Sequence, residues 1–382
     1  MPELPAPNLP ATGTFVTRLW RPGVGPAVVL HRNGELIDIT SPATPTMRDL
    51  MERDDLPQYL ATRSGPVVAR LADLTGLEPA ADSPHLLSPA DLQAIKACGV
   101  TFARSMIDRV IEERAAGDAS RALAIRQRVT SAIGDSLRNL RPGSAEAAEV
   151  KRLLQAEGLW SQYLEVGIGP DAEVFTKAPP MASVGYGASV GLHPISKWNN
   201  PEPEVVLAVA SNGQIKGAAL GNDVNLRDVE GRSALLLGKA KDNNAAAAIG
   251  PFIRVFDASF GIDEVRQLEL TLTVTGLDGF TLTGRSSMSE ISRDPVDLVA
   301  QTIGRHHQYP DGFLLYCGTM FAPVQDRDGP GQGFTHHLGD VVTIATPALG
   351  NLTNVVRLST EAPPWTFGTA ALMRNLAGRG VL

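Results

Sequence analysis

Residues 198–223 read WNNPEPEVVLAVASNGQIKGAALGND, and the interpretation of the whole chain starts from this stretch. Two apolar runs, 205–209 and 215–220, flank a Ser-Asn-Gly turn signal, which predicts a β-hairpin with a deeply buried first strand. Glu202 and Glu204 stand at the entrance to that strand. Because residues two apart in an extended chain point to the same side, we expect both carboxylates to face one point.

A third acid, Asp223, follows the second apolar run, where a hairpin of this length would return it to the glutamate pair. An exposed Glu-x-Glu on an edge strand is the alternative for the pair alone, since such acids commonly face solvent. Three converging carboxylates instead repel one another unless a cation lies between them. Oxygen ligands of this kind suit Mg²⁺ or Mn²⁺. We therefore predict that Glu202, Glu204 and Asp223 bind Mg²⁺, with Mn²⁺ as the alternative ion.

Four motifs, taken in order, resemble the fumarylacetoacetate hydrolase family. They are Glu202-Pro203-Glu204, Asn222-Asp223 continuing to Arg227-Asp228, Lys241 ahead of Ile249-Gly250-Pro251, and Gly318-Thr319. The sequence pattern N-D-V-x-x-R-D-x-E-G, which starts at Asn222, is most similar to that of the family's dehydratases of 2-keto-3-deoxy pentonates. This resemblance covers roughly residues 165–350.

The resemblance implies an α+β, mainly β fold with a mixed β-sandwich roll as the metal-binding catalytic domain, residues 165–382. Residues 1–87 read as a small N-terminal α/β domain, with a hairpin signal at Asn33-Gly34. Residues 88–164 read as a helical arm, with a helix expected to start at Ser88. Within the arm an apolar face is expected at Val129, Ile133, Leu137 and Leu140.

The resemblance also implies roles for single residues. The metal ligands are the three acids above, and the catalytic candidates are Lys241, Glu112 and Thr319. The substrate-binding candidates are Ser105, Lys177, Arg227, Lys241 and Thr319. Glu112 would act as the acid that assists departure of a hydroxyl, although a solvated turn explains it equally well. The base stays open between Lys241 and a metal-bound hydroxide, and Lys239 is close enough in sequence to be confused with Lys241.

One segment of the arm, residues 99–108, separates the activities found in the family. Its carbon–carbon hydrolases carry a His and Glu dyad here, and this chain has Ser105 and Asp108 in their places. A serine cannot exchange a proton near pH 7 as imidazole does. The expected reaction is therefore dehydration of a 2-keto-3-deoxy-D-pentonate to 2,5-dioxopentanoate by a hydro-lyase. A fumarylacetoacetate- or acylpyruvate-type hydrolase, an oxaloacetate decarboxylase and a non-enzymatic keto-acid binding protein remain alternatives.

The composition and charge of the chain limit which binding partners we expect. The 382 residues carry a net charge of −7 and no long basic run, so nucleic acid and anionic membrane surfaces are not expected partners. Residues 1–13 have neither a basic start nor an apolar core, so we do not expect them to act as a secretory signal, and no apolar run reaches the ~18 residues that a membrane span needs. Two cysteines cannot form a disulfide framework, which favours a cytoplasmic location. The resemblance implies a homodimer or homotetramer.

Overall fold

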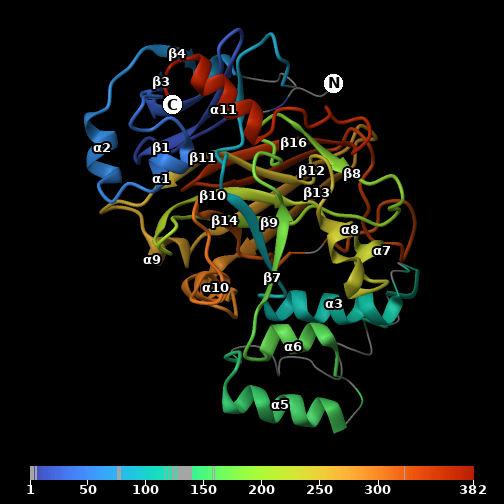
Figure 1. Ribbon diagram of the computed structural model, residues 1–382. Helices are drawn as coiled ribbons and strands as arrows, with labels where there is room; N and C mark the ends of the chain where they lie inside the picture. The colour runs from blue at the N-terminus through green and yellow to red at the C-terminus, as the bar shows by residue number, and fades with distance from the viewer. Residues whose placement is uncertain are drawn as a thin grey trace.

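The computed structural model describes residues 4, 7–74, 79–116, 118, 120–122, 125–126, 140–156, 158, 160–321 and 323–382. Over these residues the strands form two sheets (Figure 1). The larger sheet has the order β4-β3-β2-β1-β11-β10-β9-β14-β6-β7, with β5 paired to β1. Its strands are β1 (Phe15–Arg21), β2 (Gly25–Arg32), β3 (Glu35–Asp38), β4 (Val67–Arg70), β5 (His85–Leu87), β6 (Ala94–Gly99), β7 (Glu173–Ala178), β9 (Pro203–Val209), β10 (Ile215–Asp223), β11 (Ala247–Val255) and β14 (Phe313–Tyr316).

The smaller sheet has the order β13-β12-β15-β16-β8. Its strands are β8 (Ser189–Leu192), β12 (Glu269–Thr275), β13 (Thr281–Ser287), β15 (Val341–Thr346) and β16 (Gly350–Leu358). The helices are α1 (Met47–Met51), α2 (Leu56–Thr62), α3 (Ala103–Ala115), α5 (Ala145–Ala156), α6 (Gln162–Ile168), α7 (Arg227–Glu230), α8 (Leu237–Lys241), α9 (Ile262–Val265), α10 (Pro295–Thr302) and α11 (Thr369–Gly378), with 3₁₀ turns η1 (Leu71–Asp73), η3 (Ala234–Leu236) and η4 (Met288–Glu290).

Strand β9 is buried on both faces, as its unbroken apolar run predicts. Val205, Leu207 and Val209 join the hydrophobic core that also contains residues of β12, β15 and β16 from the smaller sheet. Val206 and Ala208 face a second core that α1 and α2 cover. Alternate residues of a strand point to opposite faces, so one strand supplies both cores. The strand that carries the acidic pair is therefore held rigidly from both sides.

The predicted hairpin is confirmed. Strands β9 and β10 are antiparallel neighbours, with Glu204 opposite Gly221. The Asp223 amide donates to the Glu202 carbonyl at 3.1 Å. This register brings the end of β10 to the start of β9. The N-terminal hairpin is confirmed as well: Asn33 and Gly34, between β2 and β3, both have positive φ, as the tight turn requires.

The predicted helix start at Ser88 is wrong. An irregular stretch follows Ser88 and leads into β6, which lies in the larger sheet between β14 and β7. Asp91, expected in the first turn of that helix, instead binds a different part of the chain. Its carboxylate accepts hydrogen bonds from the backbone amides of Met47 and Arg48, at 2.7 and 3.0 Å, and so satisfies free donors at the start of α1. The acid expected in the first turn of the predicted helix thus serves a helix more than forty residues away in the sequence.

Helices α3, α5 and α6 fall within or next to the stretch predicted as a helical arm, residues 88–164. In Figure 1 α3, α6 and α5 lie below the sheets, one under the other. They pack through buried side chains that include Met106, Val110, Leu154 and Leu164. The predicted apolar positions Val129, Ile133 and Leu137 lie outside the described residues. In the described part of the chain, no helix combines the length and the hydropathy that crossing a membrane takes.

Candidate active site

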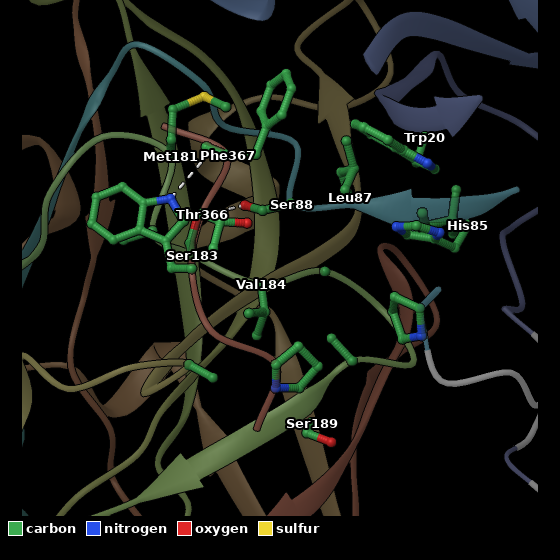
Figure 2. Close-up of a pocket in the computed structure, with 18 of the residues that line it drawn as sticks. Trp20, His85, Leu87, Ser88, Met181, Ser183, Val184, Ser189, Thr366 and Phe367 are labelled. Carbon is green, nitrogen blue, oxygen red and sulfur yellow. Dashed lines mark hydrogen bonds between the residues drawn. The ribbon is translucent and has the colours of Figure 1, made fainter. Parts of the chain in front are cut away.

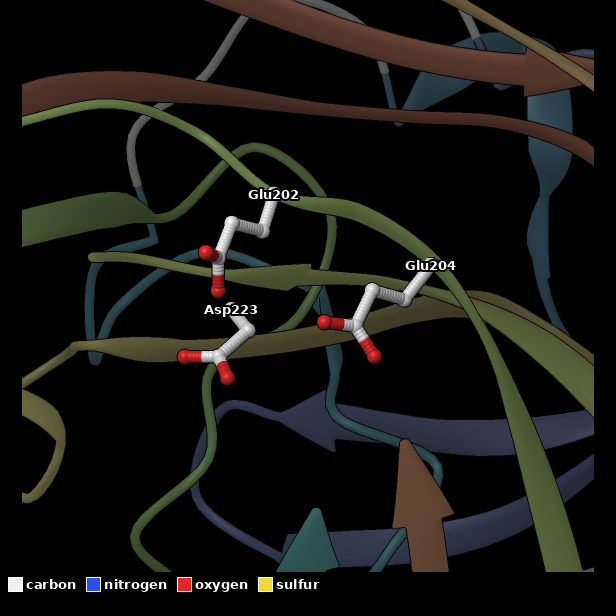
Figure 3. A group of neighbouring side chains, drawn as sticks. All are labelled: Glu202, Glu204 and Asp223. Carbon is white, nitrogen blue, oxygen red and sulfur yellow. The ribbon is translucent and has the colours of Figure 1, made fainter. Parts of the chain in front are cut away.

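The predicted trio of acids converges. Glu202, Glu204 and Asp223 each offer a carboxylate oxygen, and these oxygens lie within 4.8 Å of one another (Figure 3). All three are buried, with exposed fractions of 4% for Glu202, 2% for Glu204 and 2% for Asp223. The hairpin register explains the convergence, because Glu204 and Asp223 stand at adjoining ends of β9 and β10 and Glu202 pairs with Asp223 through the backbone. All ligand atoms are hard oxygens, which fits Mg²⁺ or Mn²⁺.

Three cations from other elements hold two of these acids. Lys241 Nζ lies 2.6 Å from Glu202 Oε2 and 3.2 Å from Asp223 Oδ2. Lys177 Nζ forms an ion pair with Asp223 Oδ1 at 2.6 Å. Arg109 Nη2 lies 2.6 Å from Glu202 Oε1. Each acid keeps lone pairs for a metal ion.

Glu204 differs from its two neighbours. Its Oε2 accepts a hydrogen bond from the Gly318 amide at 2.6 Å, and no cation among the described residues pairs with it. Burial, and then repulsion by Asp223 and Glu202, raise the pKa of Glu204 well above its ordinary value. A metal ion would remove that penalty, since a nearby positive charge favours the ionised form.

The charges around the trio also leave room for a divalent cation. Among the described residues six carboxylates gather here with four cations, so ionisation of all six would leave two negative charges without a partner. The carboxylates are Glu112, Glu173, Glu202, Glu204, Asp223 and Glu230, and the cations are Arg109, Lys177, Arg227 and Lys241. Buried charges are normally paired. One divalent ion would balance the set.

The cavity that these acids enclose is small, about 20 Å³. That volume is close to what one water-sized particle needs. It is lined by the three acids together with Ser105, Lys241 and Thr319 from the predicted set, and by Cys98, Gly99, Val100, Arg109, Glu173, Phe175, Glu230 and Gly318. Residues from β6, β7, β9, β10, α3, α7 and α8 therefore meet at one point.

Three other predicted site residues do not line this cavity. Lys177 lies behind Asp223, where it also donates to the Lys241 carbonyl at 2.7 Å. Arg227 Nε lies 2.7 Å from Glu112 Oε1, and both side chains are buried, with exposed fractions of 2% for Arg227 and 4% for Glu112. Burial acts to raise the pKa of Glu112, but Arg109 and Arg227 outweigh it and lower that pKa. Glu112 thus stays ionised.

Ser105 lines the cavity, but its hydroxyl serves its own helix. The hydroxyl donates to the Phe102 carbonyl at 2.8 Å and accepts from the Phe102 amide at 3.3 Å, which caps the start of α3. The position at which the family's hydrolases carry a histidine therefore has no group here that could activate water.

The structure shows which of the two neighbouring lysines, Lys239 or Lys241, lines the cavity. Lys241 is 2% exposed and lines the cavity, whereas Lys239 is exposed to solvent. Burial acts to lower the pKa of Lys241, but Asp223 and Glu202 outweigh it and raise that pKa above its ordinary value. Lys241 thus carries a positive charge, which suits binding of an anion.

Glu173 is one of the cavity residues that were not predicted from the sequence. It begins β7 and lines the cavity beside the three acids. Burial, and then repulsion by Glu230, raise the pKa of Glu173 to about 7. A signal was available, because Glu173, Phe175 and Lys177 alternate along one strand and so share one face. A carboxyl group with a pKa near neutrality in a cavity is suited to proton transfer.

A second, larger cavity of about 320 Å³ lies elsewhere (Figure 2). Its walls come from β1, β5 and the C-terminal segment and include Trp20, His85, Met181 and Phe367. Trp20 meets Phe367 edge to face, with ring centroids 5.5 Å apart. None of the predicted site residues lines this cavity. The three candidate metal ligands and Lys241 line the smaller one.

Fold and site together define a protein with a buried carboxylate trio at the start of a central hairpin. Residues 168–357 match the family model of the fumarylacetoacetate (FAA) hydrolase C-terminal domain, and this part of the chain belongs to that family. The resemblance read from the four motifs is confirmed.

Two curated relatives are more specific. "Probable 2-keto-3-deoxyxylonate dehydratase" of Haloferax volcanii is 30% identical over 194 residues, 51% of this chain and 63% of the relative. 2-Dehydro-3-deoxy-D-arabinonate dehydratase of Saccharolobus solfataricus is 29% identical over 185 residues, 48% of this chain and 58% of the relative. The matches thus span about three fifths of the length of these relatives.

Solved structures share the fold over most of the chain. The apo form of 2-keto-3-deoxy-D-arabinonate dehydratase matches with a TM-score of 0.63 at 19% identity, over 91% of this chain and 99% of that one. The enzyme of that name complexed with magnesium and 2,5-dioxopentanoate matches with a TM-score of 0.59 at 19% identity, with the same coverage. The predicted fold class, α+β and mainly β, is confirmed.

Proposed function

We propose that this chain is a Mg²⁺-dependent hydro-lyase that converts a 2-keto-3-deoxy-D-pentonate to 2,5-dioxopentanoate. The observation that carries the proposal is the buried trio of acids, whose ligand oxygens lie within 4.8 Å of one another. The names of the relatives support the substrate class. D-Xylonate and D-arabinonate share their C4 configuration and lose their C2 and C3 centres in forming the keto acid, so both names describe one substrate.

Glu202, Glu204 and Asp223 would hold the ion. A bound divalent cation would polarise the C2 keto group and make the C3 protons more acidic. Lys241, kept charged by Glu202 and Asp223, would bind the carboxylate of the substrate. The Thr319 hydroxyl, at the edge of the cavity, would complete the contacts to the keto acid.

Glu173 is the residue that we assign to proton transfer. Its carboxylate would take a proton from C3 and give it to the C4 hydroxyl, which leaves as water while the C3–C4 double bond forms. A proton lost from C5 and returned at C3 then gives the C4–C5 enol, and transfer of the enol hydroxyl proton to C4 yields the aldehyde of 2,5-dioxopentanoate. A pKa of about 7 allows the group to exist in both protonation states near neutral pH. Glu112, which was the candidate from sequence, is replaced in this role because it does not line the cavity.

Incubation of the purified protein with 2-keto-3-deoxy-D-xylonate tests the proposal. We expect 2,5-dioxopentanoate, trapped as a hydrazone and identified by mass, with Mg²⁺ and none after chelation by EDTA. Parallel incubations with an acylpyruvate and with oxaloacetate test the hydrolase and decarboxylase alternatives. Turnover of either of these without formation of the semialdehyde would refute dehydration. Binding of the keto acid without turnover of any of the three would instead indicate a binding protein.

A further inference from the structure

Arg109 of α3 contacts three buried acids from three parts of the chain. Its Nη2 lies 2.6 Å from Glu202 Oε1, and its Nη1 lies 2.7 Å from Glu112 Oε2 and 3.0 Å from Glu230 Oε2. Glu202 precedes β9, Glu112 lies on the same helix as Arg109, and Glu230 ends α7. A guanidinium group presents five donors in a fixed plane, so it can bind several carboxylates in a set geometry.

Arg109 fixes the orientation of a candidate metal ligand. Glu202 is held at both oxygens, at Oε1 by Arg109 and at Oε2 by Lys241 at 2.6 Å. A carboxylate held at both ends cannot rotate, yet each oxygen retains a lone pair for an ion. We propose that Arg109 is a positioning residue that orients Glu202 for the metal ion. This inference rests on the metal site of the proposed function.

Arg109 is itself held by a second ion pair. Glu112, its partner on α3, also binds Arg227 Nε at 2.7 Å. Arg227 in turn donates to the Pro323 carbonyl at 3.0 Å, and its guanidinium lies 4.7 Å from the centre of the Trp198 ring. Positive and negative groups therefore alternate from Glu202 outward, and none of them is free to turn. The arm helix α3 thus contributes to the order of the site, although its serine does not.

The geometry of Arg109, not its charge alone, carries the inference. A lysine would keep the charge but would replace the planar fork with a compact point charge on a flexible stem. It could not hold Glu202 and Glu112 in the same arrangement. Groups that orient metal ligands typically change metal affinity 10–100-fold when they are altered. Arg109→Lys should therefore weaken metal binding about ten-fold or more at constant charge.

The experiment measures Mn²⁺ binding to the full chain in the absence of substrate, by titration calorimetry and by the electron paramagnetic resonance spectrum of the bound ion. We expect Arg109→Lys to raise the Kd about ten-fold or more and to alter the spectrum. The matched control is Arg114→Lys, an exposed arginine of the same helix that donates to the Gly158 carbonyl. It should leave both readouts unchanged.

A second pair of variants keeps the test decisive if Arg109→Lys fails to fold. Glu112→Gln removes the charge of one of the three acids that hold Arg109. Asp108→Asn removes the same charge from the same helix at a residue that pairs with Arg126 at 2.6 Å. We expect Glu112→Gln to weaken Mn²⁺ binding and to change the spectrum more than Asp108→Asn does. Equal effects of these two variants, or wild-type binding by Arg109→Lys, would overturn the inference. Absence of Mn²⁺ binding by the wild-type protein would instead overturn the proposed metal site.

Discussion

Glu173→Gln should raise stability and lower activity, two effects of opposite sign. Glu173 has an ordinary pKa of 4.5, raised to about 7 by burial and by Glu230. The folded protein without metal therefore binds a proton at Glu173 more tightly than the unfolded chain does. Its stability falls as pH rises from about 4.5 to about 7, and the loss is complete above that range. At 1.36 kcal/mol for each pKa unit, the loss is on the order of 3 kcal/mol.

The substitution removes that pH-dependent loss because a glutamine does not ionise. We expect the metal-free variant to unfold at a higher temperature than wild type at pH 8 and at the same temperature at pH 4. Dehydration should fall about 10²–10⁴-fold, which is what a group that transfers protons contributes. Thermal unfolding followed by circular dichroism at both pH values, and formation of 2,5-dioxopentanoate with Mg²⁺, measure the two effects.

Opposite signs distinguish proton transfer from a structural role. A glutamate needed only for packing would cost stability and activity together when it is replaced. Glu290→Gln, at an exposed glutamate in η4, is the matched control and should change neither quantity. Full activity of Glu173→Gln, or a lower unfolding temperature at pH 8, would refute the assignment of Glu173.

Three further substitutions probe the site. Glu204→Gln should abolish Mg²⁺-dependent dehydration while keeping the fold, because this acid pairs with no cation among the described residues; activity equal to wild type would remove it from the site. A methyl group at Gly99 would collide with the Glu173 carboxylate, so Gly99→Ala should lower turnover at least ten-fold with little change in unfolding temperature. Unchanged turnover would show that this carboxylate can move without cost. Lys177→Met should destabilise the metal-free protein by about 3–5 kcal/mol at pH 7, since Asp223 loses a buried partner, and a denaturation midpoint equal to that of wild type would contradict this.

Much of the site was predictable because its residues lie close together in sequence. A two-residue spacing in an extended chain placed Glu202 and Glu204 on one side, and the hairpin returned Asp223 to them. These are short-range geometric consequences of strand structure. Arg109 shows where such reasoning ends, because it reaches Glu202 across 93 positions of sequence and no local pattern specifies that contact.

The same limit explains the one wrong helix. The residues after Ser88 carry the composition of a helix start, but Asp91 binds amides at the start of α1 instead. A side chain satisfies whichever donors the folded chain brings to it, near or far.

The sequence by itself determined the buried hairpin, the trio of acids on it and the family, because strand periodicity and motif order are properties of neighbouring residues. Only the tertiary structure decided that Glu173 enters the cavity and that Glu112 stays outside it, paired with Arg227. Burial and the charges of distant neighbours set those roles, and both exist only once the chain has folded.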